Sequence, residues 1–314
     1  MVDTGRMSRI RGAILGAVVG DAFAAPFEGA PRRGLHELIE RRSQRPTPWR
    51  YTDDGIMVVA VAESIADAAT VDPEDLFHRF LARYEPARGF GRGMKLALDA
   101  FAGGTRWEDC AQAAWPEGSR GNGGAVRIVA IAVAAWPDAA DRRRAVELAT
   151  RTTHAHEEAL AMATLHAAAL ALVASDPQTA HDHRRFLALL RRWVSARALA
   201  SLDHVEQLLE AQSSADDTAR ALGTSALAAE SVPAALWAFL RHCDSFEEAV
   251  AGAARLGGDA DSICCMTGAL AGARHGDDAI PAAWLANLRG DDPTPAAVLE
   301  LADRVAAVVP RLVP

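Results

Sequence analysis

The stretch Ala13-Ile14-Leu15-Gly16-Ala17-Val18-Val19, followed at once by Gly20-Asp21, is either a buried first helix or part of a signal peptide. Arginines precede this apolar run and small residues follow it, so the segment superficially resembles a signal peptide. The Gly20-Asp21 pair interrupts that pattern, and cleavage there would remove a helix that the remainder of the chain needs. We therefore interpret the run as a buried first helix, with secretion as the minority alternative.

The rest of the 314-residue chain has the same helical character. Apolar residues recur at helical spacing nearly everywhere, and alternating runs rich in Val, Ile and Thr are nearly absent. No Ser/Gly/Pro-rich linker and no fixed-period repeat divides the sequence. We expect an all-α fold, with one compact multi-helix domain over residues 1–314. The expected helices are 9–19, 34–42, 54–69, 73–84, 93–101, 123–135, 140–150, 156–174, 178–197, 202–211, 232–243, 245–254, 261–274 and 294–309.

Composition excludes several classes of protein. The net charge of −8 makes nucleic acid an unlikely partner, because binding phosphates takes clustered Lys and Arg. Arg142-Arg143-Arg144 is interpreted as a solvated helix face. The apolar run 159–174 includes His166 and is too short for a membrane span, so no membrane partner is expected. The four cysteines form no Cys-x-x-Cys pair, which favours a reducing cytoplasm, with Cys264 and Cys265 as small buried helix residues.

Two acidic stretches stand where a turn gives way to an apolar helix. They are Tyr51-Thr52-Asp53-Asp54 and Gly257-Gly258-Asp259-Ala260-Asp261-Ser262. Each can be an ordinary helix start, in which a capping residue and acids in the first turn complement the helix dipole. Together they offer four carboxylates and two hydroxyls, an all-oxygen set suited to Mg²⁺ or Mn²⁺. We predict that the two stretches meet in space around metal, although capping alone explains either one.

An ordered set of motifs resembles the ADP-ribosylglycohydrolase family. The resemblance covers roughly residues 9–276 and is weakest over about 176–243. The motifs that carry it are residues 12–28, Tyr51-Thr52-Asp53-Asp54, Arg88-Gly89-Phe90-Gly91, residues 118–127, Thr153-His154 and residues 257–263. The resemblance implies an all-α enzyme with two Mg²⁺ or Mn²⁺ ions that releases ADP-ribose from modified side chains or related adducts.

Residue roles are carried over from the resemblance position by position. The implied metal ligands are Thr52, Asp53, Asp54, Asp259, Asp261 and Ser262. Glu28 matches the family's acidic residue after the first helix and is the implied catalytic acid or base. This residue set suits the reaction, because cleavage at the ribose C1″ develops oxocarbenium character and metals can position hydroxyls and water. The implied substrate is an ADP-ribosylated protein or a small ADP-ribosyl compound, bound by a monomer or weak oligomer.

The remaining motifs are interpreted as substrate contacts. The residues concerned are Gly89, Phe90, Gly91, Ser119, Arg120, Gly121, Asn122, Gly123 and His154. The glycine-rich stretch 118–124 offers backbone N–H groups to a diphosphate, and an ordinary glycine turn is the alternative. Phe90 can equally be packed inward, and His156 is interpreted as a surface cap.

Four positions depart from the family pattern. Gly55 and Ala260 stand where threonine is common, and Ser262 replaces a threonine while keeping its hydroxyl. Arg120 replaces an aromatic of some members, which puts adenosine stacking at that position in doubt.

Two other functions stay open. The pair His181-Asp182 suggests a helical metal-dependent phosphohydrolase of the His-Asp type, although it lies in a polar, loop-like stretch. A catalytically silent, ADP-ribose-binding or structural relative would keep the fold without turnover. Retention of Glu28 and of every acidic ligand favours an active hydrolase over that alternative.

Overall fold

The computed structural model describes residues 4–31, 33–136, 138–288 and 290–308, and in them it confirms the all-α prediction. These ranges contain no β-strand, and their one isolated β-bridge joins Gly121 and Leu227. The α-helices are α1 (Thr4–Ala24), α2 (Leu35–Gln44), α3 (Asp53–Ala68), α4 (Pro73–Arg83), α5 (Arg92–Ala102), α6 (Trp107–Cys110), α7 (Gly123–Arg127), α8 (Val129–Val133), α9 (Ala139–Arg151), α10 (Glu157–Ser175), α11 (His183–Leu190), α12 (Ala196–Glu210), α13 (Ala215–Leu222), α14 (Ala228–Arg241), α15 (Phe246–Ala254), α16 (Ala260–His275), α17 (Ala282–Asn287) and α18 (Pro295–Ala307). Short 3₁₀ turns are η1 (Ala25–Phe27), η2 (Pro86–Arg88), η3 (Pro177–His181) and η4 (Asp277–Ala279).

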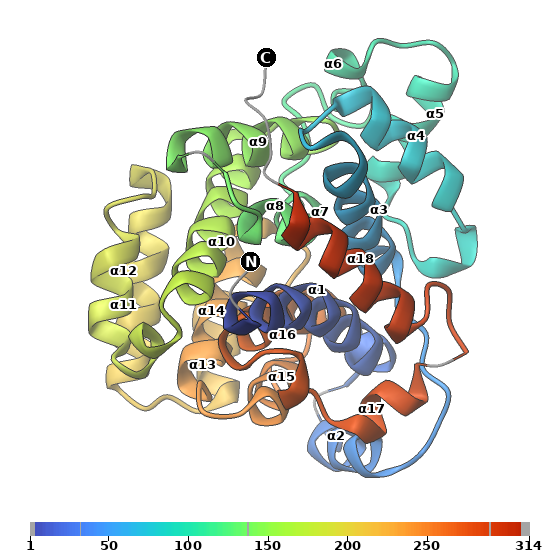
Figure 1. The fold of residues 1–314 in the computed structure, drawn as a ribbon. Coiled ribbons are helices and arrows are strands. Elements are labelled where there is room, and N and C mark those ends of the chain that lie inside the picture. The colour runs from blue at the N-terminus through green and yellow to red at the C-terminus, as the bar shows by residue number, and fades with distance from the viewer. Residues whose placement is uncertain (1–3, 32, 137, 289, 309–314) are drawn as a thin grey trace.

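Helix α1 lies at the centre of the molecule, beside α16 and in contact with α3, α8, α10 and α18 (Figure 1).

Among the described helices, two are long and apolar enough to cross a membrane by length and composition: Thr4–Phe27 and Glu157–Ser175. Within their most apolar windows, 83% and 72% of the residues are buried inside the protein. Packing in this core therefore accounts for the apolar character of both helices.

Glycines let α1 and α16 touch backbone to backbone. A Cβ atom added at Gly16 would lie 2.4 Å from the carbonyl oxygen of Gly268, and one added at Gly268 would lie 2.2 Å from that of Gly16. The same reciprocal contact joins Gly12 to Gly272, and Gly20 faces the carbonyl of Cys264. Because real Cβ atoms do not approach oxygen so closely, only glycine fits along this seam.

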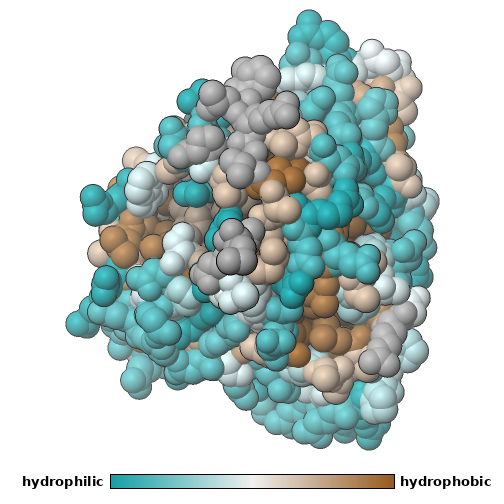
Figure 2. Space-filling view, viewed as in Figure 1, coloured by the Kyte–Doolittle hydropathy of each residue, from teal (hydrophilic) through white to brown (hydrophobic). Residues whose placement is uncertain are grey.

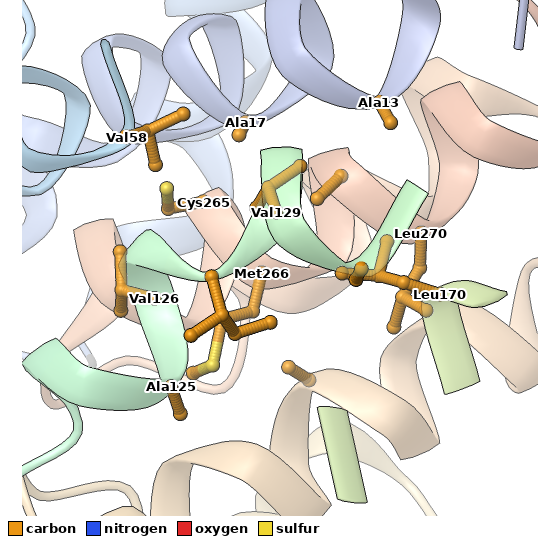
Figure 3. Packing of buried hydrophobic residues seen from close by; sticks show 14 of the residues in the cluster. Ala13, Ala17, Val58, Ala125, Val126, Val129, Leu170, Cys265, Met266 and Leu270 are labelled. Atoms are coloured by element: carbon orange, nitrogen blue, oxygen red, sulfur yellow. The ribbon is translucent and has the colours of Figure 1, made fainter. Parts of the chain in front are cut away.

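The core spreads outward from this seam. Figure 3 shows Ala13 and Ala17 of α1, Val58 of α3, Val126 of α7 and Cys265 of α16 directed into one packed cluster. Both cysteines of α16 are fully buried, which confirms the prediction that they are small core residues. Interiors of this kind are close-packed, so the helices are held at fixed separations.

One predicted helix, 123–135, is in fact two short helices, α7 and α8, with Ile128 between them. The carbonyl oxygen of Ala125 accepts a hydrogen bond of 2.7 Å from Nδ1 of His166 on α10. A continuous helix would pair that carbonyl with the N–H four residues on. A tertiary hydrogen bond from a distant helix thus competes with the local pattern.

The predicted helix 178–197 is also broken. The structure has η3, then α11, then turns over 191–194 before α12 begins at Ala196. Asp182 caps α11 by accepting the N–H of Arg185, which starts a new helix inside the predicted one. The sequence analysis also missed the short helices α6, α13 and α17.

The seam between α1 and α16 is directly testable. We expect Gly268→Ala to lower the free energy of unfolding by about 1–3 kcal/mol, because the new methyl group forces the helices apart. Urea denaturation followed by circular dichroism measures this. Gly290→Ala is the matched control, since nothing lies within 4 Å of a Cβ added there. Equal unfolding midpoints for the two variants would contradict the proposed role of the seam.

Candidate metal centre

Asp21, at the end of α1, fastens the first acidic stretch to the core. Its carboxylate is fully buried and accepts three hydrogen bonds of 2.8 Å: the N–H groups of Thr52 and Gly55 to Oδ2, and the hydroxyl of Thr52 to Oδ1. A Cβ added at Gly55 would lie 2.8 Å from the same carboxylate, so the glycine that departs from the family pattern leaves room for this contact. Asp21 therefore fixes where α3 begins.

Thr52 is the N-cap of α3, as the capping interpretation predicted. Its side chain accepts the N–H of Asp54 at 3.3 Å while its hydroxyl donates to Asp21. Capping satisfies one of the free N–H groups at a helix start and leaves the following carboxylates near the positive end of the dipole. The same capping turn therefore starts α3 and places Asp53 and Asp54 at its N-terminus.

A buried ion pair supports the same turn from the other side. Nη1 and Nη2 of Arg88 donate to the two carboxylate oxygens of Asp291 at 2.9 and 2.7 Å. Nη1 also donates to the carbonyl of Tyr51 at 2.7 Å, and Asp291 accepts the N–H of Tyr51 at 3.0 Å. A bidentate pair of this kind has a defined geometry, so it holds Tyr51 and the acidic residues after it in register.

The two acidic stretches meet, as the sequence analysis predicted. The hydroxyl of Ser262, in the first turn of α16, donates to Oδ2 of Asp54. Carboxylate oxygens of Glu28, Asp259 and Asp261 lie within 4.8 Å of one another. The amide Nδ2 of Asn122 donates to Asp259 and also to Ser231 at 3.0 Å, which joins the glycine-rich stretch to the cluster.

These groups line a cavity of about 260 Å³. All six predicted metal ligands and the predicted catalytic residue Glu28 line this cavity. Seven of the predicted substrate-binding residues also line it: Gly89, Gly91, Ser119, Gly121, Asn122, Gly123 and His154. Met57, Arg88, Arg92, Gly93, Met94, Trp115 and Ala226 complete the lining. The ligand and substrate roles themselves stay predictions.

Two predicted substrate residues do not line the cavity. Phe90 is buried with its ring 4.9 Å from that of Tyr84, which is the inward packing held open as the alternative. Arg120 is exposed, and its Nε donates to Nε2 of His156 at 3.1 Å. His156 caps α10 by accepting the N–H of Glu158, as predicted for a surface cap.

The glycine-rich stretch 118–124 offers fewer free backbone N–H donors than its sequence suggests. The N–H of Gly121 donates to the hydroxyl of Ser119 at 3.1 Å, and that of Asn122 donates to the carbonyl of Ala226 at 2.9 Å. These two donors are therefore already used within the protein. Any phosphate contact by this stretch would come from its other groups.

Burial and mutual repulsion raise the pKa values of the clustered acids. Desolvation raises the pKa of Asp21 from 3.8 to about 7, against the opposing hydrogen bonds from Thr52 and Gly55. Desolvation and then the charge of Asp21 raise the pKa of Asp53 to about 7. The pKa values of Asp54 and Asp261 are raised further, first by desolvation and then by neighbouring aspartates.

The donor set fits hard divalent cations. In the described ranges, none of Glu28, Asp53, Asp54, Asp259 and Asp261 forms an ion pair with Arg, Lys or His. Carboxylates gathered in this way must either take up protons or bind cations, because an uncompensated buried charge is costly. Oxygen ligands only, with two hydroxyls and no thiol or imidazole among them, match Mg²⁺ or Mn²⁺.

His154 lines the same cavity as the acids, and the buried Arg127 is linked to it through Thr153. Arg127 is fully buried and donates to Thr153 Oγ1 at 2.8 Å, to Thr152 Oγ1 at 2.9 Å and to the carbonyl of Ala149 at 2.6 Å. Thr153 Oγ1 in turn lies 2.7 Å from Nδ1 of His154. Burial, and then the charge of Arg127, lower the pKa of His154 to about 3, so the imidazole is neutral.

The residues behind the phosphohydrolase alternative lie outside the cavity. Asp182 is a helix cap, and His181 lies 3.1 Å from a carboxylate oxygen of Asp244 and 2.8 Å from Nη2 of Arg274. Although His181, Cys243 and Asp244 are close enough together to hold a metal ion, Arg274 already places a positive charge there. The group is explained by ion pairing.

The sequence analysis missed four residues that shape the site: Asp21, Arg88, Arg127 and Asp291. Asp21 carried a detectable signal, because it is a carboxylate directly after a fully apolar run. Arg127 ends the glycine-rich motif, so its position was available but its burial was not. Nothing local marks Asp291, whose role depends on a partner 203 positions away.

The fold and site define a class: an all-α protein with a carboxylate-rich cavity of the kind that binds divalent cations. The sequence profile of the ADP-ribosylglycohydrolase family matches residues 3–312. The chain is 32% identical to the ADP-ribosylhydrolase ARH3 of Danio rerio, over 91% of this chain and 88% of that protein. It is 28% identical to the ADP-ribosylarginine hydrolase Tri1 of Serratia proteamaculans, over 90% of this chain and 75% of that one.

A solved structure described as an ADP-ribosylglycohydrolase-related protein complex superimposes with a TM-score of 0.66 at 28% identity, covering 96% of this chain and 98% of that one. This protein belongs to the ADP-ribosylglycohydrolase family. The fold expected from the family resemblance is confirmed.

The raised pKa values predict how stability depends on pH without divalent cations. Because folding raises the pKa of Asp53, the folded protein binds more protons, and the stability from that group is lost as pH rises from about 4 to about 7. We expect Asp53→Asn to have a higher melting temperature than the parent in EDTA, with the difference growing over that range. Added Mn²⁺ should remove the advantage, since the cation replaces the protons.

Differential scanning fluorimetry in EDTA and in Mn²⁺ measures both effects. Asp99→Asn, at an exposed position of α5, is the control for loss of a negative charge. A pH-independent difference between Asp53→Asn and the parent would contradict the account.

Proposed function

We propose that the protein is a metal-dependent hydrolase that cleaves the glycosidic bond between ADP-ribose and a modified protein side chain or a related ADP-ribosyl adduct. The observation that carries this proposal is the gathering of Glu28 and the two acidic stretches on one cavity wall, in a chain of the ADP-ribosylglycohydrolase family. The names of its relatives, an ADP-ribosylhydrolase and an ADP-ribosylarginine hydrolase, support the same substrate class.

Two Mg²⁺ or Mn²⁺ ions are the proposed cofactors. Thr52, Asp53 and Asp54 on one side, and Asp259, Asp261 and Ser262 on the other, would hold them. When bound, such ions hold ribose hydroxyls and a water in fixed positions and lower the pKa of that water. The hydrogen bonds from Thr52 to Asp21 and from Ser262 to Asp54 orient the hydroxyl groups before any ion arrives.

Glu28 is the proposed catalytic acid or base. It follows η1 on the rim of the cavity, where it is exposed to substrate. Partial burial and the charge of Asp259 raise its pKa, which brings the carboxyl closer to the range in which it can exchange a proton near neutral pH. Glu28 would accept the proton of the water that attacks C1″ and pass it to the nitrogen or oxygen that leaves as that bond breaks.

The far wall of the cavity is proposed to hold the ADP-ribose. Gly89 has a φ of 98°, which favours glycine, and a Cβ there would lie 3.3 Å from Asp53 Oδ1, so the absence of a side chain keeps the space beside Asp53 open. Trp115 packs over Gly93, on which a Cβ would lie 2.5 Å from the indole, and it lines the cavity. Its ring offers the aromatic surface that Arg120 does not, and neutral His154 offers a hydrogen-bonding nitrogen.

The test is a release assay across defined linkages. Peptides ADP-ribosylated on arginine or on serine, and a small ADP-ribosyl adduct, are incubated with the protein in Mg²⁺, Mn²⁺ or EDTA. We expect cation-dependent release of free ADP-ribose from at least one of them. Glu28→Gln should slow release by about 10²–10⁴-fold while leaving cation binding intact, since it removes only proton transfer.

One outcome would decide against the hydrolase, and another against the role of Glu28. Tight binding of ADP-ribosyl peptide in Mn²⁺ without any release would identify a catalytically silent relative. Equal release by Glu28→Gln and the parent would remove Glu28 from the mechanism. His181→Ala serves as the matched control, because it changes a residue outside the cavity and should leave the rate unaltered.

A further inference from the structure

A second cavity, unconnected with the acidic cluster by any shared residue, lies between α9, α10 and the turn that joins α11 to α12. Its volume is about 430 Å³, larger than the 260 Å³ of the candidate metal centre. On the face shown in Figure 2, apolar colour gathers at the left, over α10 and the α11–α12 hairpin, and hydrophilic residues border it. A recess of this size is within the range of small-molecule sites.

The floor of this cavity is apolar. Ala167, Ala168, Ala171 and Leu172 of α10 form one side, and Val146 of α9 faces them. Alanines leave a shallow, smooth surface on which a flat molecule can lie. Apolar surface removed from water here would contribute roughly 25 cal/mol per Å² to binding.

Two arginines at the edge lack an acceptor for their guanidinium groups. Arg142 and Arg192 both line the cavity, and neither side chain forms a hydrogen bond or ion pair with the described residues. Their neighbours differ: Arg143 is paired with Glu147 at 2.9 Å, and Arg144 with Asp141 at 3.4 Å. Arg142 is also half-buried, and desolvation lowers its pKa.

The sequence analysis placed Arg142 on a solvated helix face together with Arg143 and Arg144. In the structure Arg143 and Arg144 are exposed, as that interpretation expects, whereas Arg142 is half-buried and lines the cavity beside Arg143. A half-buried cation without a counter-ion is costly unless a ligand supplies the negative charge.

The cationic character continues into an adjoining recess of about 300 Å³, which shares Arg143 and Thr164 with the first cavity. That recess adds Arg151 and Arg197, against the acids Glu147 and Glu157. Arg143 is paired with Glu147 and Arg197 with Glu157 at 2.6 Å, so Arg151 is the arginine that adds uncompensated positive charge among the described residues of this recess.

An aromatic ring completes the site. Trp193, in the turn between α11 and α12, lines the cavity with 56% of its surface exposed. Large aromatic side chains are enriched where proteins bind ligands, because a flat ring can stack on them. Arg192, its neighbour in sequence, brings a positive charge to the same edge.

We propose that this cavity binds a small organic anion: a planar, apolar body that carries a phosphate or carboxylate group. The planar part lies on the alanine floor beside Trp193, and the anionic group pairs with Arg142 and Arg192. The site is separate from the hydrolytic centre, so its ligand is a second ligand of the protein.

The probes are 1-naphthyl phosphate and 1-naphthoate, titrated by isothermal calorimetry in EDTA, with inorganic phosphate and uncharged 1-naphthol as partial ligands. We expect one saturable site for a naphthyl anion and much weaker binding of either partial ligand. Arg142→Ala and Arg192→Ala should each weaken binding by about tenfold or more, since each loses a charged hydrogen bond. Trp193→Ala should weaken it as well, and Arg142→Lys should fall between Arg142→Ala and the parent.

The matched control is Arg144→Ala, on the same helix with the same change of charge, and it should bind as the parent does. Circular dichroism checks that each variant is folded. We expect Arg142→Ala and Arg192→Ala to fold, because neither side chain forms a hydrogen bond or ion pair with the described residues. The proposal is overturned by non-saturable binding, by equal losses in Arg144→Ala and Arg142→Ala, or by binding that disappears in Asp261→Asn, which would locate it in the hydrolytic centre. Binding of an acidic peptide but of neither naphthyl anion would also overturn it.

Discussion

The structure depends on the backbone contact between α1 and α16. Glycines at positions 12, 16, 268 and 272 let the two helices approach until carbonyl oxygens occupy the space of missing side chains. Both helices carry acids at the ends that meet: Asp21 lies in the last turn of α1, and Asp261 lies in the first turn of α16. The N–H of Gly29 donates to the carbonyl of Gly258 at 2.9 Å, so Glu28 is held beside the same helix start. A change in helix separation would therefore be a change in carboxylate spacing.

The acidic cluster is unfavourable for the metal-free protein, and its surroundings are built to hold it nevertheless. Both carboxylate oxygens of Asp21 accept hydrogen bonds from N–H and hydroxyl groups at the start of α3. The ion pair of Arg88 and Asp291 is hydrogen-bonded to the backbone of Tyr51. Desolvation and then the charges of neighbouring carboxylates raise the pKa values of Asp53 and Asp54. The repulsion persists because the hydrogen bonds at the start of α3 keep these carboxylates from moving apart. If the proposed cations bind here, side chains held in this way would have little need to rearrange.

Sequence reasoning reached the helical class, the buried first helix and the meeting of the two acidic stretches. It did so because periodicity, capping residues and the order of motifs are local or family-wide signals. It failed where the local structure depends on a residue far away in the sequence. His166 bonds the carbonyl of Ala125 inside the helix expected at 123–135, and Asp291 accepts the N–H of Tyr51. The glycine spacing along α1 was visible but was not used, since its meaning depends on the matching glycines of α16.

The most direct test of the account is a crystal structure with Mn²⁺, recorded at the manganese absorption edge. The account predicts two anomalous peaks in the cavity, within ligand distance of the side chains of Asp53 and Asp54 on α3 and of Asp259 and Asp261 beside it. In Asp261→Asn at least one peak should weaken while the backbone of α1 and α16 stays in place. No peak in this cavity, or unchanged peaks in Asp261→Asn, would contradict the central proposal that the two acidic stretches hold divalent cations.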